Sequence, residues 1–164
     1  MTAFFYSFLS KYSCYSLALI LLMSMINITL CHAESKPSKF IGSLACKNCH
    51  KKEYASFITF AKKSRSFESI ERVKKGLQEN EIKECYFCHT TGYGRTGGFI
   101  SVEKTPHLKN AGCEVCHGPG ELHAKTGSIN SIKRHMSMED CEGCHTSERV
   151  NAFRYKPMIH GGAH

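Results

Sequence analysis

Four copies of the pentapeptide Cys-x-x-Cys-His constrain what this chain can fold into more than any other feature. The copies begin at Cys46, Cys85, Cys113 and Cys141. Two cysteines one helical turn apart can each bond a vinyl group of a porphyrin, and the following histidine can supply an axial nitrogen to its iron. One copy could arise by chance, but four copies in 164 residues predict four covalently attached c-type haems.

The motifs also define the predicted cofactor-binding residues. The attachment cysteines would be Cys46, Cys49, Cys85, Cys88, Cys113, Cys116, Cys141 and Cys144, and the proximal iron ligands His50, His89, His117 and His145. Cys-x-x-Cys pairs also occur as zinc half-sites and as redox-active dithiols. Neither alternative requires a histidine directly after the second cysteine, so haem attachment is the favoured interpretation.

The N-terminal part of the chain has the composition of a signal peptide. It contains a single basic residue, no acidic residue and a mainly apolar run from Leu17 to Leu30, followed by Ala33 as a suitable cleavage position. The run is short for a membrane-spanning helix. We therefore expect residues 1–33 to be a signal peptide and residues 34–164 to form one tetrahaem domain in the periplasm, with no stable membrane span after cleavage. An uncleaved leader that anchors the chain is the alternative.

The cysteine count and the net charge argue against disulfides and against nucleic-acid binding. Two of the ten cysteines precede the expected cleavage point and the rest all lie in the motifs, so no structural disulfide is expected. The formal net charge of +8 does not indicate nucleic-acid binding, because the propionates of four haems would oppose it. The basic pairs Lys51-Lys52, Lys62-Lys63 and Lys74-Lys75 could steer an acidic redox partner or could simply be solvated.

Short helices joined by long connections fit the apolar pattern best. A helical pattern runs from the first motif to a stop at Gly76 and is carried by Tyr54, Phe57, Ile58, Ala61, Phe67, Ile70 and Val73. The chain has no tryptophan and few long apolar runs, so haems would supply much of the core. The predicted fold is mainly α, with short helices and long loops wrapped around four closely packed haems. We expect residues 34–45 to be extended and residues 99–102 to form a short strand.

Two glycine-rich segments predict turns. Residues 92–98 match the Gly-x-Gly-x-x-Gly pattern of dinucleotide sites, but they follow a haem motif rather than a strand. We interpret them as a tight loop that lets backbone lie close to a haem. Gly118-Pro119-Gly120, after the third motif, predicts a helix end and a sharp turn.

Three features of the chain resemble the cytochrome c-554 family of tetrahaem cytochromes. They are the order of the motifs, the Gly-Tyr-Gly…Gly-Gly loop after the second motif, and the sequence Cys-Glu-x-Cys-His-Gly-Pro-Gly at the third. The resemblance covers residues 44–160. It implies a mainly helical fold with haems in close pairs, two-histidine coordination of most irons, and a five-coordinate iron at the second motif.

The resemblance also implies distal ligands. By position, His123 resembles the distal ligand of the first haem and His135 that of the fourth, while the haem held by His89 would be the open one. The family places the remaining distal histidine where this chain has Lys62. The third iron could also be open, or its ligand could be one of three residues: His107, His160 or Lys62. Methionine ligation, by Met136, Met138 or Met158, is less favoured where histidines are at hand.

Electron transfer is the favoured function, because irons with two histidines leave no place for a substrate. The chain would carry electrons between a donor dehydrogenase or membrane quinol oxidase and a terminal reductase. The second hypothesis is an enzyme that reduces nitric oxide, nitrite or hydroxylamine at the open iron, with Tyr93, Arg95 or Lys62 as polar neighbours. The third is an electron-transfer subunit of a larger complex.

Overall fold

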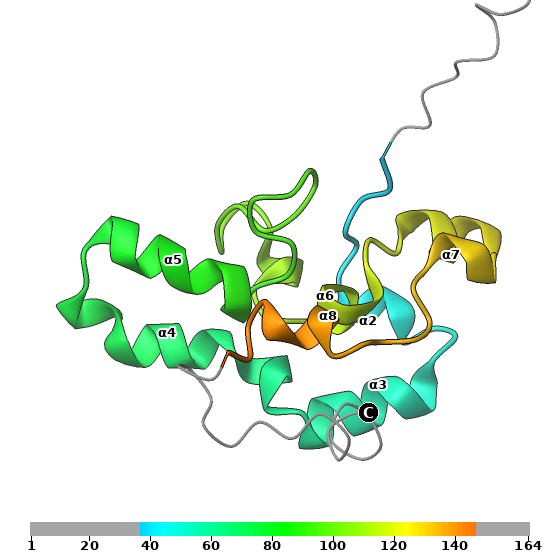
Figure 1. Cartoon of the computed structure of the whole chain (residues 1–164), viewed down its shortest axis with the longest axis horizontal. Coiled ribbons are helices and arrows are strands. Elements are labelled where there is room, and N and C mark those ends of the chain that lie inside the picture. Colours follow the sequence, from blue (N-terminus) through cyan, green and yellow to red (C-terminus); the bar gives the residue numbers. More distant parts are fainter. Residues whose placement is uncertain (1–36, 147–164) are drawn as a thin grey trace, which may run out of the picture. The chain divides into compact units, whose positions relative to one another are not determined.

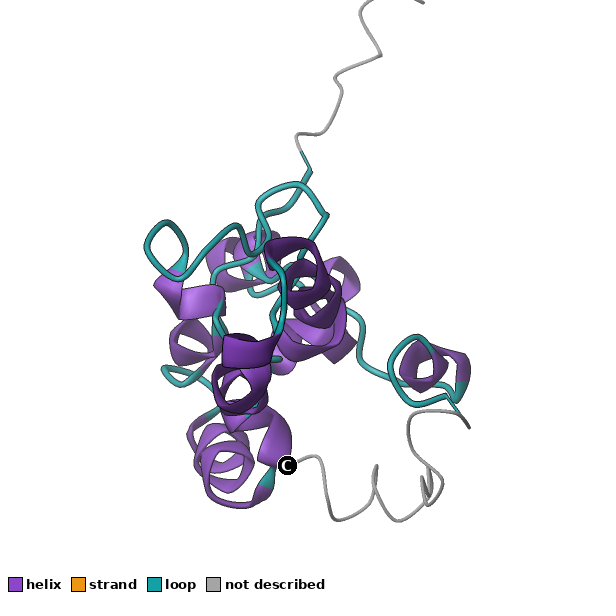
Figure 2. Cartoon of the chain, turned by 90° about the vertical axis from the view of Figure 1, so that its left-hand side faces the viewer, coloured by secondary structure: helices purple, strands orange, loops and turns teal. Residues whose placement is uncertain are grey.

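The chain divides into two compact units, Met1–Lys36 and Pro37–His164. The computed structural model describes residues 37–146, all within the second unit. The predicted signal peptide, His160 and Met158 therefore lie outside the described residues. Within residues 37–146 every regular element is a helix and no strand occurs, which confirms the mainly α fold class (Figure 1 and Figure 2).

The helices alternate with long connections. The α-helices are α2 (Ser43–Cys46), α3 (Lys51–Phe60), α4 (Phe67–Val73), α5 (Glu79–His89), α6 (Cys113–His117), α7 (Glu121–Thr126) and α8 (Glu139–Glu142). Single turns of 3₁₀-helix are η1 (Lys62–Arg65), η2 (Lys74–Gly76), η3 (Pro106–Leu108) and η4 (Ile129–Ser131). In the part of the chain that the structure describes, no helix is both long and apolar enough to span a membrane.

The helical pattern after the first motif is divided by a corner at Ala61. There α3 ends, because Ala61 has extended backbone angles (φ −81°, ψ 113°). The Ser64 hydroxyl donates to the Ala61 carbonyl at 2.8 Å and stabilises this corner. The prediction that the pattern runs on unbroken is therefore wrong at Ala61, while the predicted stop at Gly76 is confirmed by the end of η2.

A small core joins α4 and α5, which lie side by side (Figure 1). Its buried side chains are Phe40, Phe67, Ile70, Phe99 and Leu108. Tyr86 of α5 packs onto this core, with its ring centre 6.0 Å from that of Phe67 and 5.1 Å from that of Phe99. Because Tyr86 belongs to the second motif, the core fixes that motif to the body of the fold.

Two local predictions are wrong. Residues 99–102 do not form a strand, because the Phe99 N–H makes a single backbone bond to the Thr91 carbonyl and the Ile100 N–H then donates to the Thr105 hydroxyl. That second bond turns the chain toward η3 instead of continuing a ladder. Of the segment 34–45 expected to be extended, residues 34–36 lie outside the described residues and residues 37–42 form no regular element, but Ser43 begins α2.

The glycine loop of residues 92–98 is the predicted tight loop, but its close approach is to an aromatic side chain. Gly92 has φ +71°, and a Cβ placed on it would lie 2.6 Å from the ring of Phe40. A Cβ on Gly98 would overlap the Gly92 carbonyl oxygen. Arg95 of the same loop also lies over the Phe40 ring, with its guanidinium carbon 5.1 Å from the ring centre. The Phe40 ring therefore accounts for glycine at position 92, and the backbone of the loop itself accounts for glycine at position 98.

Candidate haem-binding site

Each motif forms one helical turn, so its cysteines and histidine lie on one face. The His50 N–H donates to the Cys46 carbonyl at 2.9 Å, and the His145 N–H donates to the Cys141 carbonyl at 2.8 Å. The third motif is the whole of α6, and the second is the last turn of α5. Residues three and four apart share a helix face. All the motif cysteines are free thiols, as double attachment to a porphyrin requires.

Backbone carbonyls orient three of the predicted iron ligands. Nδ1 lies 2.8 Å from the Ser66 carbonyl oxygen in His89, 2.7 Å from that of Lys133 in His117, and 2.9 Å from that of Ser128 in His123. A carbonyl oxygen only accepts, so Nδ1 is the donor in each neutral ring and Nε2 keeps its lone pair. This is the arrangement that metal-binding histidines show in proteins.

His50 and His123 lie together, although His123 comes from α7. Their ring centres are 6.2 Å apart and their planes are inclined by 28°. Two imidazoles on opposite faces of one iron, each with a nitrogen about 2 Å from the metal, would have ring centres about 6 Å apart. The residues at the first motif therefore fit a haem iron with two axial histidines.

Exposed apolar side chains adjoin the motifs. Leu44 precedes Cys46 in α2 and is 65% exposed, while Phe87 lies between the second-motif cysteines and is 59% exposed. Phe60, at the end of α3, is 75% exposed. Apolar groups at such positions are suited to contact a porphyrin, so the apolar surface fits the cofactor as well as the ligands do.

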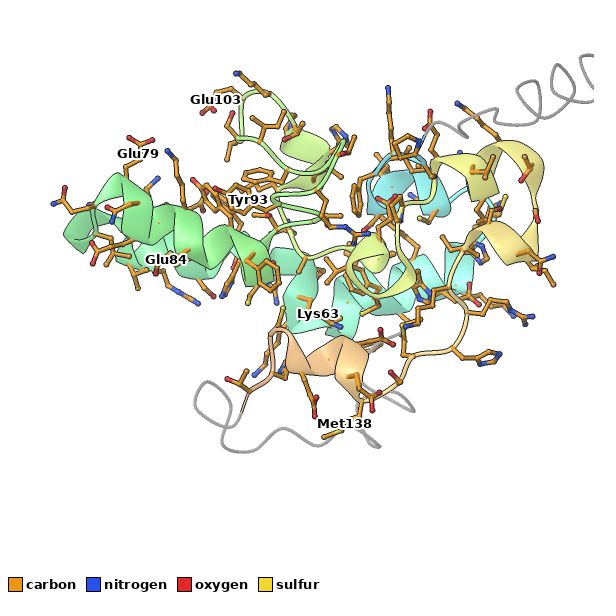
Figure 3. The ribbon with its side chains drawn as sticks, turned by 45° about the horizontal axis from the view of Figure 1, so that its top comes forward. Lys63, Glu79, Glu84, Tyr93, Glu103 and Met138 are labelled. Atoms are coloured by element: carbon orange, nitrogen blue, oxygen red, sulfur yellow. The ribbon has the colours of Figure 1, made fainter. Side chains whose placement is uncertain are left out.

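The remaining candidate ligands are spread over the chain. His107 lies beside the start of α2, since a Cβ on Gly42 would come within 2.8 Å of its carbonyl oxygen. His135 is exposed in the segment between η4 and α8. Lys62 is exposed, whereas its half-buried neighbour Lys63 points toward the third motif and donates from Nζ to Cys116 Sγ at 3.8 Å (Figure 3). The sequence pointed to Lys62 by its position. The structure shows that Lys63, after the corner at Ala61, is the lysine that reaches the third motif.

The polar residues expected near the second motif are not equivalent. Tyr93 packs edge-on against Tyr86, with ring centres 5.3 Å apart (Figure 3). Arg95 lies instead against Phe40. Burial raises the pKa of the Tyr86 phenol. Of the three polar candidates, Tyr93 is thus the one that the structure brings to the motif.

The first and third motifs adjoin each other. The Cys113 N–H donates to the Ser43 hydroxyl at 3.0 Å. The thiols of Cys46 and Cys113 share a hydrogen bond, which lowers the pKa of Cys113 to about 6 and raises that of Cys46. Glu114, between the two cysteines of the third motif, is 1% exposed and binds the chain just before α2. Sequence analysis assigned no role to Glu114.

Lysines connect the third and fourth motifs. The Lys133 N–H donates to the His117 carbonyl, and the Lys133 ammonium pairs with Asp140 next to Cys141. Hydrogen bonds from Lys133 and from the Ser137 backbone hold the pKa of Asp140 below its ordinary value. Burial, with the nearby Lys63 cation as a smaller contribution, lowers the pKa of His145.

Known proteins are similar to this chain in sequence and in fold. The family described as cytochrome c554 and c-prime matches residues 45–118. Cytochrome c-554 of Nitrosomonas europaea is 29% identical over 119 residues, which cover 63% of this chain and 50% of that protein, so the match spans about half of the relative's length. The reduced state of cytochrome c554 from the same organism has a similar fold, with a TM-score of 0.54 and 22% identity over 78% of this chain and 85% of that one. Motifs, fold and relatives all show that the chain is similar to the cytochrome c-554 family of multihaem c-type cytochromes.

Proposed function

We propose that this chain is a periplasmic electron carrier with four covalently attached haems. The geometry at His50 and His123 carries this proposal, because two imidazoles at 6.2 Å suit an iron that exchanges electrons rather than substrate. Haem iron supplies one-electron chemistry at a potential set by its axial ligands, burial and nearby charge. The cysteines of the four motifs would attach the porphyrins, and His50, His89, His117 and His145 would be the proximal ligands.

Distal coordination is proposed for two further histidines. His123 would serve the haem of the first motif, which its Nδ1 bond to Ser128 and its distance to His50 support. His135 would serve the haem of the fourth motif, on positional grounds alone. For the third motif, His107 and His160 are the candidate histidines.

The polypeptide's own task is to orient ligands and to keep them rigid. Three imidazole rings each donate from Nδ1 to a backbone carbonyl, and these bonds restrict rotation of the rings. The carbonyls belong to Ser66, Lys133 and Ser128. Fixed ligands need little rearrangement when an electron arrives or leaves, and carbonyl bonds of this kind also raise ligand basicity.

The proposed partners are redox proteins. We propose a donor dehydrogenase or a membrane quinol oxidase on one side and a terminal reductase on the other. Exposed lysines support an acidic docking surface on a partner, since complementary charge accelerates encounter. Lys51, Lys52, Lys74 and Lys75 are all exposed. The expected signal peptide of residues 1–33 would deliver the chain to the periplasm.

The test is spectroscopy on the full chain produced with a haem-attachment system. Four haems per chain by mass, low-spin signals at low temperature and no turnover of small nitrogen compounds are expected. A high-spin signal that disappears with nitric oxide would locate an open iron, and turnover of nitric oxide, nitrite or hydroxylamine would then replace the carrier with a reductase. Co-purification with a dehydrogenase would instead favour a subunit of a larger complex.

A further inference from the structure

Glu114 is a buried carboxylate at the junction of two motifs. It lies in α6 between Cys113 and Cys116, and only 1% of the residue is exposed. Its Oε2 accepts from the Gly42 N–H at 2.7 Å, and its Oε1 accepts from the Gly120 N–H at 2.7 Å. The Ile41 N–H is shared between the two oxygens at 3.0 and 3.1 Å.

In all of these bonds a backbone N–H donates to a Glu114 oxygen, and this arrangement suits an ionised carboxylate. A carboxylate only accepts, whereas a carboxylic acid would direct its own O–H at one of these N–H groups. Among the ion pairs of the described residues, which involve Glu71, Glu79, Glu121 and Asp140, none includes Glu114. The structure therefore holds a buried carboxylate with backbone N–H dipoles, and within residues 37–146 no cation forms an ion pair with it.

The same carboxylate organises the chain around the first motif. Residues 38–42 run along residues 114–122, where the Lys39 N–H donates to Glu121 and the Glu121 N–H donates to the Lys39 carbonyl. The Ser38 hydroxyl donates to the Pro119 carbonyl at 3.1 Å. Glu114 binds the last residues before α2, so it places the first motif against the third.

The charge of Glu114 is felt at the neighbouring motif. The Gly42 N–H donates to Glu114, and the Gly42 carbonyl oxygen lies 4.0 Å from Cys46 Sγ, so one residue separates the carboxylate from the first motif. An added electron is disfavoured by the same negative charge, most strongly where water is excluded. Burial and nearby charge are among the factors that set a haem potential.

We propose that Glu114 is a positioning residue whose buried charge lowers the reduction potentials of the haems at the first and third motifs. This inference rests on the proposed four-haem carrier. Electrons within the carrier would then reside preferentially on the haems of the second and fourth motifs, because those of the first and third would have lower potentials. The haems at the second and fourth motifs would be little affected.

The fourth motif provides a matched control. Glu142 follows Cys141 just as Glu114 follows Cys113, but Glu142 is exposed. Exposed charges are screened by water and salt, so the Glu142→Gln variant should leave all potentials close to those of the unmodified protein. The same Glu→Gln change at equivalent motif positions therefore distinguishes the effect of a buried charge from the effect of a glutamate at that motif position.

The experiment is a spectroelectrochemical titration of the holoproteins with haem content measured by mass. Glu114→Gln is expected to keep four haems and to raise two of the four potentials by about 59 mV, a tenfold change in a one-electron equilibrium. Glu114→Asp keeps the charge while shortening the side chain, and its potentials should change much less. Four unchanged potentials in Glu114→Gln, or equal shifts in the Gln and Asp variants, would overturn the role of the charge.

Haem loading keeps the outcomes separate. If Glu114→Gln loses haem while Glu114→Asp retains four haems and near-normal potentials, the requirement for charge is supported. If both variants lose haem, Glu114 is a structural residue only and the inference fails. The unmodified protein reports on the proposed function independently, because fewer than four haems there would refute the carrier itself.

Discussion

The imidazoles of His50 and His123 lie with their ring centres 6.2 Å apart, one at the end of the first motif and the other on α7. The Gly118-Pro119-Gly120 turn makes this meeting possible, because Gly118 ends α6 with φ +79° and α7 begins immediately after Gly120. The third motif and the candidate distal ligand of the first haem are thus joined by a single turn.

Replacing His123 should open one iron. In the His123→Ala holoprotein, one of the four haems should change from low spin to high spin and should bind nitric oxide in its reduced state, because a distal nitrogen is lost. Low-temperature EPR checks this. Lys125→Ala, on the exposed side of the same helix, should leave the spectrum unchanged. A His123→Ala spectrum identical to that of the unmodified protein would refute the assignment.

Ser66 should stabilise the second motif. Its hydroxyl donates to the His89 carbonyl and accepts from the Ala111 N–H, both at 2.8 Å. Ser66→Ala removes both bonds and should lower the free energy of unfolding by about 2 kcal/mol. Thermal unfolding of the holoprotein measures this loss. Ser69→Ala on α4, whose hydroxyl accepts only from exposed Arg72, should cost less than about 0.5 kcal/mol, and equal losses would contradict the prediction.

Two glycines of the loop should respond differently to alanine. Gly94 has φ +76° and open space at its Cβ position, so Gly94→Ala should cost about 1 kcal/mol of stability for the left-handed backbone. Gly92→Ala has the same backbone cost and also forces a methyl group against the Phe40 ring, for a total of about 3 kcal/mol. Denaturant unfolding of both variants tests this order, and a reversed order would show that Phe40 does not limit the loop.

Lys63 should act on potentials with the opposite sign to Glu114. Its ammonium contacts Cys116 and influences His145, so it favours an added electron near the third and fourth motifs. Lys63→Gln is expected to lower potentials in that region by up to about 59 mV, a tenfold change in the equilibrium. Redox titration measures this effect. Lys75→Gln, an exposed lysine of η2, is the control and should change them far less.

Acid should weaken the contact between Lys133 and Asp140. The pKa of Asp140 is depressed in the folded chain, so its contribution to stability is present above the ordinary aspartate pKa of about 4 and disappears as pH falls through the lower folded value. The stability difference between the unmodified protein and Asp140→Asn should therefore be constant above about pH 5 and shrink below about pH 4. Thermal unfolding across this range checks it. A difference that grew with acid would contradict the shift.

The sequence predicts the chemistry of the site better than its spatial relationships. Cys-x-x-Cys-His specifies attachment because the motif is local, and one helical turn suffices to form it. Glu114 and Glu142 occupy the same motif position, yet one is buried and the other exposed, because the residues that cover Glu114 come from residues 41–42 and 120. The corner at Ala61 likewise interrupts a helical pattern that no proline or glycine marks. The long-range contacts of Glu114 in particular leave no periodic signal in the sequence.

The pairing of residues 38–42 with residues 114–122 also bears on the order of assembly. A chain delivered to a new compartment from its N-terminus presents the first motif long before the segment that binds it arrives. On the export route proposed above, the first motif would until then lack the partner segment that closes over it. On that route, docking of the first motif against residues 114–122 would be a late step of assembly.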